Sequence, residues 1–336
     1  MTRAPTHDPR PSTSSAGPDL RRAPQEDLVG QHDAIVVGVR ADGAPEPALD
    51  FALQEAGRRR RAVHVVHAYG VQVYAEEPTV DWGGLVGEVR AAALDRTYAA
   101  LNQATGRCGH HGVPTVVTVV ESDVVPALAQ AAQGAALLVV GSRGGGALRR
   151  GTRGSVSAGC LHDVAVPVAV VPDRSRAGGD RGPCRVVVGY DGSPAADAAL
   201  MWGVVHAREW GCDLVPVVVS TSRVRPPPGL AADVAASGAS LETVVRSRLD
   251  RAGSRGSGVR AHCLIGTPVE QLRRVVRPGD LLVVGSRGHG ALASLLIGST
   301  SLTLAESLSC PVVVVRSGHQ TPVAVRPPRS SKGAES

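Results

Sequence analysis

Three glycines in the second half of the chain have the type and spacing of an anion-binding loop. Gly285 and Gly288 directly follow an apolar run, and nine residues later Gly298 and Ser299 precede a segment with helical spacing. Glycine lets backbone N–H groups approach a ligand closely, because it has no Cβ. A helix N-terminus adds unpaired N–H donors and a partial positive charge, which favour phosphate. We therefore predict that these residues, together with Thr300, bind phosphate.

The same pattern occurs earlier in the chain. Its members, in the same order and with the same spacing, are Gly141, Gly144, Gly154, Ser155 and Val156. A single glycine motif would be weak evidence. Two copies, each between an apolar strand-like run and a helix-like segment, indicate a duplicated domain with a phosphate loop in each copy.

Alternating strand and helix patterns must position these loops. We expect strands at 34–39, 62–68, 115–120, 137–140 and 167–171, then at 185–190, 213–219, 259–265, 281–285 and 312–315. Helical spacing occupies 45–60, 85–103, 124–132, 195–210, 232–252, 268–276 and 300–308. This alternation predicts two doubly wound, Rossmann-like or flavodoxin-like α/β domains with parallel sheets. Both loops leave the carboxyl ends of strands, where such sheets bind ligands.

Composition sets the domain boundaries and the kind of core. Residues 1–32 and 317–336 are rich in polar residues and proline, and we expect them to be disordered. Domains at 33–172 and 184–316 then flank a linker at 173–183. Hydrophobic residues make up 43% of the chain but aromatic residues only 2%. The cores must therefore consist of Val, Leu and Ala, as is typical of buried parallel strands.

The charge, the cysteine spacing and the lack of long apolar runs indicate which kinds of partner the protein does not bind. The net charge is +6, and Lys332 is the only lysine. Basic runs such as 58–61 fit solvated helix ends better than a nucleic-acid surface, which would need stacking aromatic residues. The six cysteines form no CxxC pair or zinc-finger spacing, and no run of 18 or more apolar residues occurs. We expect a cytoplasmic protein with reduced thiols that binds neither nucleic acid nor membrane.

Asp191 follows the first strand of the second domain, in the sequence Gly-Tyr-Asp-Gly-Ser-Pro. Its carboxylate can accept hydrogen bonds from a ribose, although Asp-Gly-Ser-Pro is also ordinary turn chemistry. In an ungapped alignment of the halves, Arg40 takes the place of Asp191 and Asp42 that of Ser193. The first half therefore keeps the predicted phosphate loop but has the opposite charge at the nucleoside position.

These motifs resemble the universal stress protein family, in its tandem and ATP-binding form, over both domains. The resemblance implies an adenine nucleotide alpha hydrolase-like fold that binds ATP, with Mg²⁺ or Mn²⁺. It implies that the second strand's end contacts the adenine, that Asp191 contacts the nucleoside, and that the glycine loop holds the phosphates. It also implies that strands 168–171 and 312–315 pair within one chain as a pseudo-dimer. A homodimer and unidentified protein partners stay open.

Three functions fit the sequence. The first is an ATP-binding universal stress protein that acts as a nucleotide-dependent regulatory module in the stress response. The second is a slow ATPase or phosphate-transferring enzyme, although the only lysine lies outside both domains, so neither contains a Walker A motif. The third is a scaffold that binds no nucleotide. We assign no catalytic residue.

Overall fold

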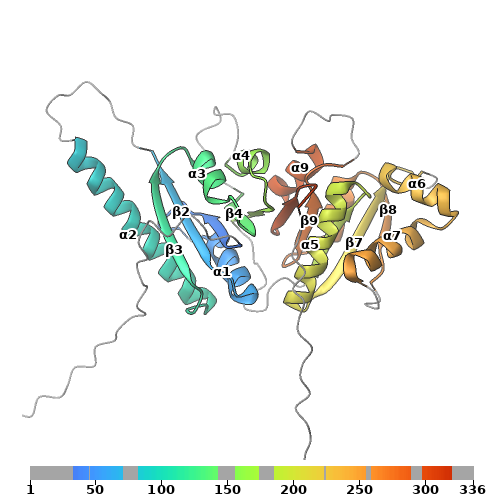
Figure 1. The fold of residues 1–336 in the computed structure, drawn as a ribbon, viewed down its shortest axis with the longest axis horizontal. Coiled ribbons are helices and arrows are strands. Elements are labelled where there is room, and N and C mark those ends of the chain that lie inside the picture. The colour runs from blue at the N-terminus through green and yellow to red at the C-terminus, as the bar shows by residue number, and fades with distance from the viewer. Residues whose placement is uncertain are drawn as a thin grey trace, which may run out of the picture.

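The computed structural model of the chain describes residues 33–44, 46–70, 82–142, 156–173, 185–222, 225–254, 259–288 and 297–319. The predicted segment 1–32 lies outside these ranges, as do the linker beyond Asp173 and the tail beyond His319. We call residues 33–173 the first half and residues 185–319 the second half. Each half is an α/β unit, and the two stand side by side (Figure 1).

The first half contains five strands and four helices among its described residues. Its strands are β1 (Ile35–Gly38), β2 (Val63–Tyr69), β3 (Thr115–Glu121), β4 (Leu137–Gly141) and β5 (Val168–Val171). Its helices are α1 (Pro47–Arg59), α2 (Trp82–Cys108), α3 (Val124–Ala131) and α4 (Val156–Asp163).

The second half repeats this order with one additional helix. Its strands are β6 (Arg185–Tyr190), β7 (Asp213–Ser220), β8 (His262–Ile265), β9 (Leu281–Gly285) and β10 (Val312–Val315). Its helices are α5 (Pro194–Trp210), α6 (Pro228–Ser237), α7 (Leu241–Leu249), α8 (Pro268–Val275) and α9 (Ser299–Ser307), with a π-helical turn η3 (Asp250–Ser254) after α7.

One sheet runs through both halves in the order β3-β2-β1-β4-β5-β10-β9-β6-β7-β8. Within each half every pairing is parallel, and the first strand lies between the second and the fourth. The halves join where β5 and β10 pair antiparallel, with Val170 opposite Val312 and Val168 opposite Val314. The predicted doubly wound fold and the predicted pairing of the last strands are both confirmed.

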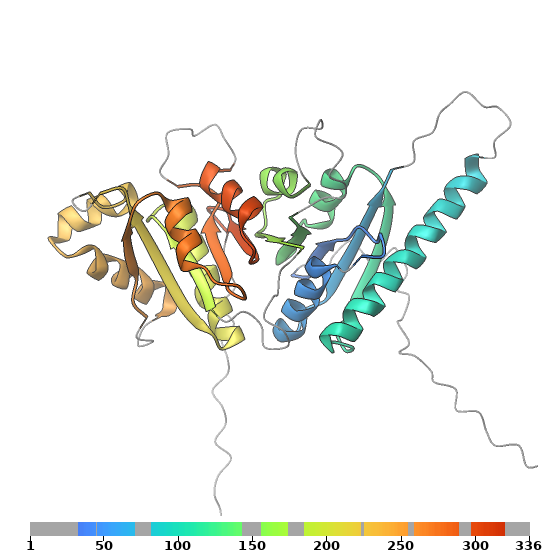
Figure 2. The ribbon, with the colours of Figure 1, turned by 180° about the vertical axis from the view of Figure 1, so that it is seen from behind.

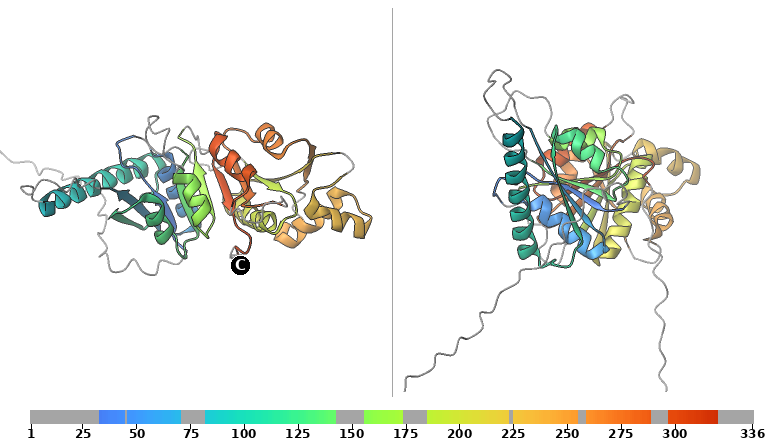
Figure 3. Two further views of the ribbon diagram at one scale, coloured as in Figure 1. Left: turned by 90° about the horizontal axis from the view of Figure 1, so that it is seen from above. Right: turned by 60° about the vertical axis from the view of Figure 1, so that its left-hand side comes forward.

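Helices cover both faces of the sheet, as the rear and side views show (Figures 2 and 3). One apolar cluster joins the sheet to α1, α5 and α7. A second cluster joins the opposite face to α3, α4, α8 and α9. Valine dominates the strands of both clusters, because a central parallel strand buries side chains on its two faces. The sequence is poor in aromatic residues because its core side chains lie mainly on buried parallel strands, where valine is the common residue.

The structure corrects three predicted boundaries. The helix predicted at 232–252 is divided into α6 and α7, because Gly238 ends α6 in a left-handed conformation (φ 61°). Ser240 then caps α7 by accepting a hydrogen bond from the Thr243 amide at 3.2 Å. Strand β8 begins at His262, three residues later than predicted, and α2 extends beyond the predicted 85–103 at both ends. Over the ranges described, no helix combines the length and apolar character needed to span a bilayer.

Candidate functional site

A cavity of about 280 Å³ lies in the second half, at the carboxyl ends of β6 and β9. From β6 the chain continues to β7 on one side, whereas β9 pairs with β6 on the other side. The strand order therefore reverses at β6, which makes this the topological switch point of the second half. The structure brings six of the predicted site residues to this cavity: Asp191, Gly285, Gly288, Gly298, Ser299 and Thr300. Val217 and Val219, near the end of β7, form an apolar part of its wall.

Two of the glycines have close neighbours that leave little space for a Cβ. A Cβ at Gly285 would lie 2.7 Å from the carbonyl carbon of Ala195 and 2.8 Å from the amide nitrogen of Ala196. A Cβ at Gly288 would collide with Oδ2 of Asp191. The glycine loop is therefore pressed against the first turn of α5 and against the Asp191 carboxylate. Any side chain at these positions would move the loop or the carboxylate.

Ser193 fastens the Asp191 turn to the glycine loop. The Ser193 amide donates to Oδ1 of Asp191 at 2.9 Å, which forms an Asx-type turn. The Ser193 hydroxyl accepts from the Ala196 amide at 3.2 Å as the N-cap of α5, and donates to the Arg287 carbonyl at 3.1 Å. Oδ1 of Asp191 therefore serves the turn, as ordinary Asp-Gly-Ser-Pro turn chemistry predicts. Oδ2 faces Gly288 at the cavity.

The N-terminus of α9 faces the same cavity. Its N-cap is Gly298, which has no side chain to cap the first turn. The nearby Ser301 hydroxyl donates to the Gly285 carbonyl at 2.7 Å, and the Gly298 amide donates to the Ser286 carbonyl at 2.7 Å. These bonds hold the helix start against the loop. Unpaired amides in the first turn of a helix and the positive end of its dipole together stabilise a nearby anion.

A polar network behind the cavity was not foreseen from the sequence. The Tyr190 hydroxyl donates to Oδ1 of Asp197 at 2.6 Å, and Arg248 donates to Oδ2 of Asp197 at 2.8 Å and to Asp233 at 2.7 Å. Burial, with the hydrogen bond to Asp197, raises the pKa of Tyr190. This network ties the end of β6 to α5, α6 and α7. The residues are too far apart in sequence for any local pattern to pair them.

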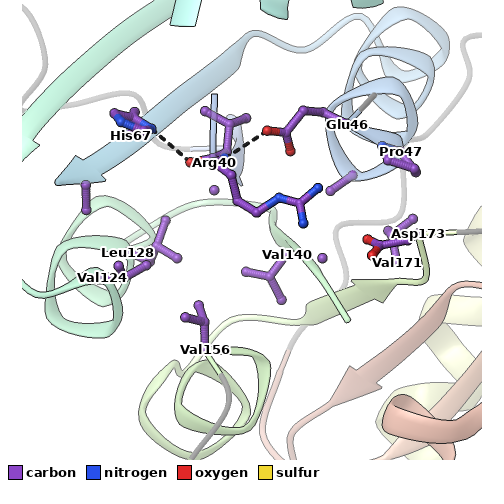
Figure 4. Close-up of a pocket in the computed structure, with 15 residues that line it drawn as sticks. Arg40, Glu46, Pro47, His67, Val124, Leu128, Val140, Val156, Val171 and Asp173 are labelled. Carbon is purple, nitrogen blue, oxygen red and sulfur yellow. Dashed lines mark hydrogen bonds between the residues drawn. The ribbon is translucent and has the colours of Figure 1, made fainter. Parts of the chain in front are cut away.

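A second cavity, also of about 280 Å³, occupies the equivalent place in the first half (Figure 4). It lies at the ends of β1, β2, β4 and β5 and is mostly apolar. Two predicted phosphate-loop residues, Gly141 and Val156, line it. The other three, Gly144, Gly154 and Ser155, lie outside the described residues.

The turn after β1 differs from the turn after β6. Glu46, before Pro47, is non-helical (φ −112°, ψ 81°), and α1 begins at Pro47, one helical turn later than α5 in the aligned sequence. Oε1 of Glu46 accepts the amides of Arg40 and Ala41, each at 2.9 Å. Burial raises the pKa of Glu46, and these two hydrogen bonds oppose part of the rise. A Cβ at Gly141 would meet no atom of the described residues within 4 Å, in contrast to Gly285.

His67 contributes a polar group to the apolar part of this cavity. Its Nδ1 lies 3.1 Å from the Val39 carbonyl oxygen. Because a carbonyl oxygen only accepts, we assign the proton to Nδ1. In the neutral ring, Nε2 is then an acceptor. No group of three or more His, Cys, Asp or Glu side chains that could hold a metal ion occurs in the described part of the chain.

The fold and its two cavities define a tandem, doubly wound α/β protein with a ligand-sized hollow at each switch point. The Universal stress protein family model matches residues 32–172 and 184–316, and the chain belongs to this family. A universal stress protein of Mycolicibacterium smegmatis is 30% identical over 294 residues, which cover 84% of this chain and 96% of that protein.

Solved structures agree with the fold. A universal stress protein from Archaeoglobus fulgidus aligns with 87% of this chain and 98% of its own, at a TM-score of 0.61 and 22% identity. Two shorter universal stress proteins were solved with adenine nucleotides. One is in complex with cAMP (23% identity, TM-score 0.31, 42% of this chain and 98% of that chain). The other, from Archaeoglobus fulgidus, is in complex with dAMP (21% identity, TM-score 0.27, 42% and 98%).

Proposed function

We propose that the second-half cavity binds an adenine nucleotide, ATP with Mg²⁺ or Mn²⁺, and that the protein is a nucleotide-dependent regulatory module of the stress response. One observation carries this proposal. Gly285, Gly288 and the uncapped start of α9 converge with Asp191 on a single cavity at a switch point. Close backbone approach and a helix N-terminus are the two features that suit a polyphosphate.

Each part of the nucleotide has a matching part of the cavity. The phosphates lie against Gly285, Gly288 and Gly298 and bind the backbone amides of Gly288, Ser299 and Thr300, because the Gly298 amide already donates to the Ser286 carbonyl. The Asp191 carboxylate, whose Oδ2 lies at the cavity, accepts from ribose hydroxyls. The base packs on the apolar wall at the end of β7. Mg²⁺ is usually held by substrate phosphates, waters and one or two carboxylates rather than by a protein cage.

The first-half cavity is, in this proposal, a second nucleotide site. Gly141, Gly144, Gly154, Ser155 and Val156 form its phosphate loop, by their correspondence with the second half. Gly141 and Val156 support this, because both line the cavity. The nucleoside part of this site has Arg40 in place of a carboxylate, a difference developed below.

Thermal unfolding with nucleotide tests the proposal. ATP with Mg²⁺ should stabilise the protein by about 2.7 kcal/mol at a hundredfold excess over the dissociation constant. Gly288→Val should abolish the part of this stabilisation due to the second half, because its side chain would displace Asp191. Gly106→Val is a matched control, since Gly106 is exposed on α2 and an added Cβ meets nothing within 4 Å. No shift at millimolar ATP would instead favour a scaffold without nucleotide.

A further inference from the structure

We propose that the first-half cavity selects an adenine nucleotide whose ribose carries a phosphate on a secondary hydroxyl, and that Arg40 is the selecting residue. This inference rests on the proposed function insofar as it takes the first-half cavity to be a nucleotide site. The second-half cavity, with Asp191, would take a nucleotide with free ribose hydroxyls. The duplicated fold thus carries two sites of different specificity.

Strand registers establish that Arg40 and Asp191 occupy equivalent places. Gly38 of β1 lies opposite Val66 of β2, and Gly189 of β6 lies opposite Val217 of β7. The contacts with the fourth strands match in the same way. Arg40 is two residues beyond Gly38, and Asp191 is two residues beyond Gly189. Each of the two side chains lines its own cavity.

The change from carboxylate to guanidinium reverses what this place can recognise. A carboxylate accepts hydrogen bonds from the two hydroxyls of a ribose. A guanidinium has five N–H donors and no acceptor, and its planar fork matches a phosphate in a bidentate geometry. In dinucleotide-binding folds the same exchange separates ribose with a free 2′-hydroxyl from ribose with a 2′-phosphate. Arg40 therefore favours a ribose that bears negative charge.

The Arg40 side chain lies at a cavity of about 280 Å³. Among the described residues, no helix turn presses on Gly141 as Ala195 and Ala196 press on Gly285, and α1 starts only at Pro47. Figure 4 shows the Arg40 side chain between Glu46 and Val140, with its guanidinium group on the side of Pro47 and Asp173. The Arg40 Nε lies 3.7 Å from the half-exposed Asp42 carboxylate.

The other ionisable groups at the cavity do not cancel this role. Glu46 uses Oε1 to bind two backbone amides, and burial raises its pKa. Asp173 is exposed after β5. Nδ1 of His67 is engaged by the Val39 carbonyl. Among the described residues that line the cavity, Arg40 is the one basic side chain with a permanent positive charge.

Calorimetric titration of a protein with the second site closed tests the proposal. In the Gly288→Val variant, the probes are adenosine 5′-phosphate, the 2′,5′- and 3′,5′-bisphosphates, and cyclic 3′,5′-AMP. At least one probe with phosphate on a secondary hydroxyl should bind about ten- to a hundredfold more tightly than the 5′-phosphate, as hydrogen bonds to charged groups suggest. Arg40→Asp should remove this preference, and Arg40→Gln should reduce it.

Controls separate this proposal from the proposed function. Arg96→Asp makes the same charge change on the exposed face of α2 and should leave the preference intact. Unfolding midpoints show whether each variant folds. Equal binding of all probes, or a preference that survives Arg40→Asp, would overturn the inference while ATP binding at the second site still stands. Loss of ATP binding in the unmutated protein, with the Arg40-dependent preference preserved, would instead contradict only the second-half assignment.

Discussion

A buried pair between α1 and α5 gives a sharp prediction about how the two halves are joined. Glu55 and His206 are both fully buried, and Nε2 of His206 lies 2.7 Å from Oε2 of Glu55. The Trp202 ring stacks on His206 with centroids 3.4 Å apart. His206→Leu leaves the Glu55 carboxyl group buried without this partner. We expect a loss of about 1–3 kcal/mol in the free energy of unfolding, typical of a buried polar group that loses its hydrogen-bond partner.

Replacing both residues should have a much smaller effect. Oε1 of Glu55 and Nδ1 of His206 have no hydrogen-bond partner among the described residues, so the pair keeps two buried polar atoms unsatisfied there. A Glu55→Leu/His206→Leu double variant removes both, and similar exchanges elsewhere were neutral or stabilising. Urea unfolding of the two single variants and the double variant gives the coupling energy. A loss below 1 kcal/mol in His206→Leu, or a double variant as unstable as the sum of the singles, would refute this reasoning.

Two further predictions concern the paired glycines and the response to pH. Gly285→Ala should lower the free energy of unfolding by about 1–3 kcal/mol, because the added Cβ meets the backbone of α5. Gly141→Ala should change it by less than about 0.5 kcal/mol. Urea unfolding of the two variants compares these effects. Burial lowers the pKa of His206 below its unfolded value near 6.5, so the unfolded chain binds more protons below that pH. Stability should be level above pH 6.5 and fall below it by at most about 1.4 kcal/mol per unit from this group. Unfolding at pH 7.5 and 5.5 measures this fall, and the double Leu variant should lack this part of it.

The parts of the fold that the sequence predicts are those fixed by short-range pattern. Runs such as Val312–Val315 are apolar throughout, which indicates a strand covered on both faces. The duplication made the fold class predictable, because two weak motifs with the same spacing support each other. Pairing of the last strands followed from the family resemblance rather than from any periodicity.

The parts that the sequence could not predict depend on contacts between distant residues. The division of 232–252 into two helices is local chemistry, at Gly238 and Ser240, that helical spacing concealed. The Tyr190, Asp197 and Arg248 network joins three elements and has no sequence signature. The Glu55–His206 pair joins residues about half a chain apart. Residue types alone give no reason to pair such groups.

The difference between the two cavities traces back to one proline. Pro47 keeps Glu46 out of the helical conformation (φ −112°, ψ 81°), so α1 begins a turn later than α5 and Glu46 is left to bind the amides of Arg40 and Ala41. No described residue closes the space beside Gly141, whereas Ala195 and Ala196 close the space beside Gly285. A long cationic side chain can therefore enter the first cavity where a short carboxylate is clamped in the second. Duplication preserved the sheet, and our inference about Arg40 assigns the different ligand charge of each half to this local difference in the backbone.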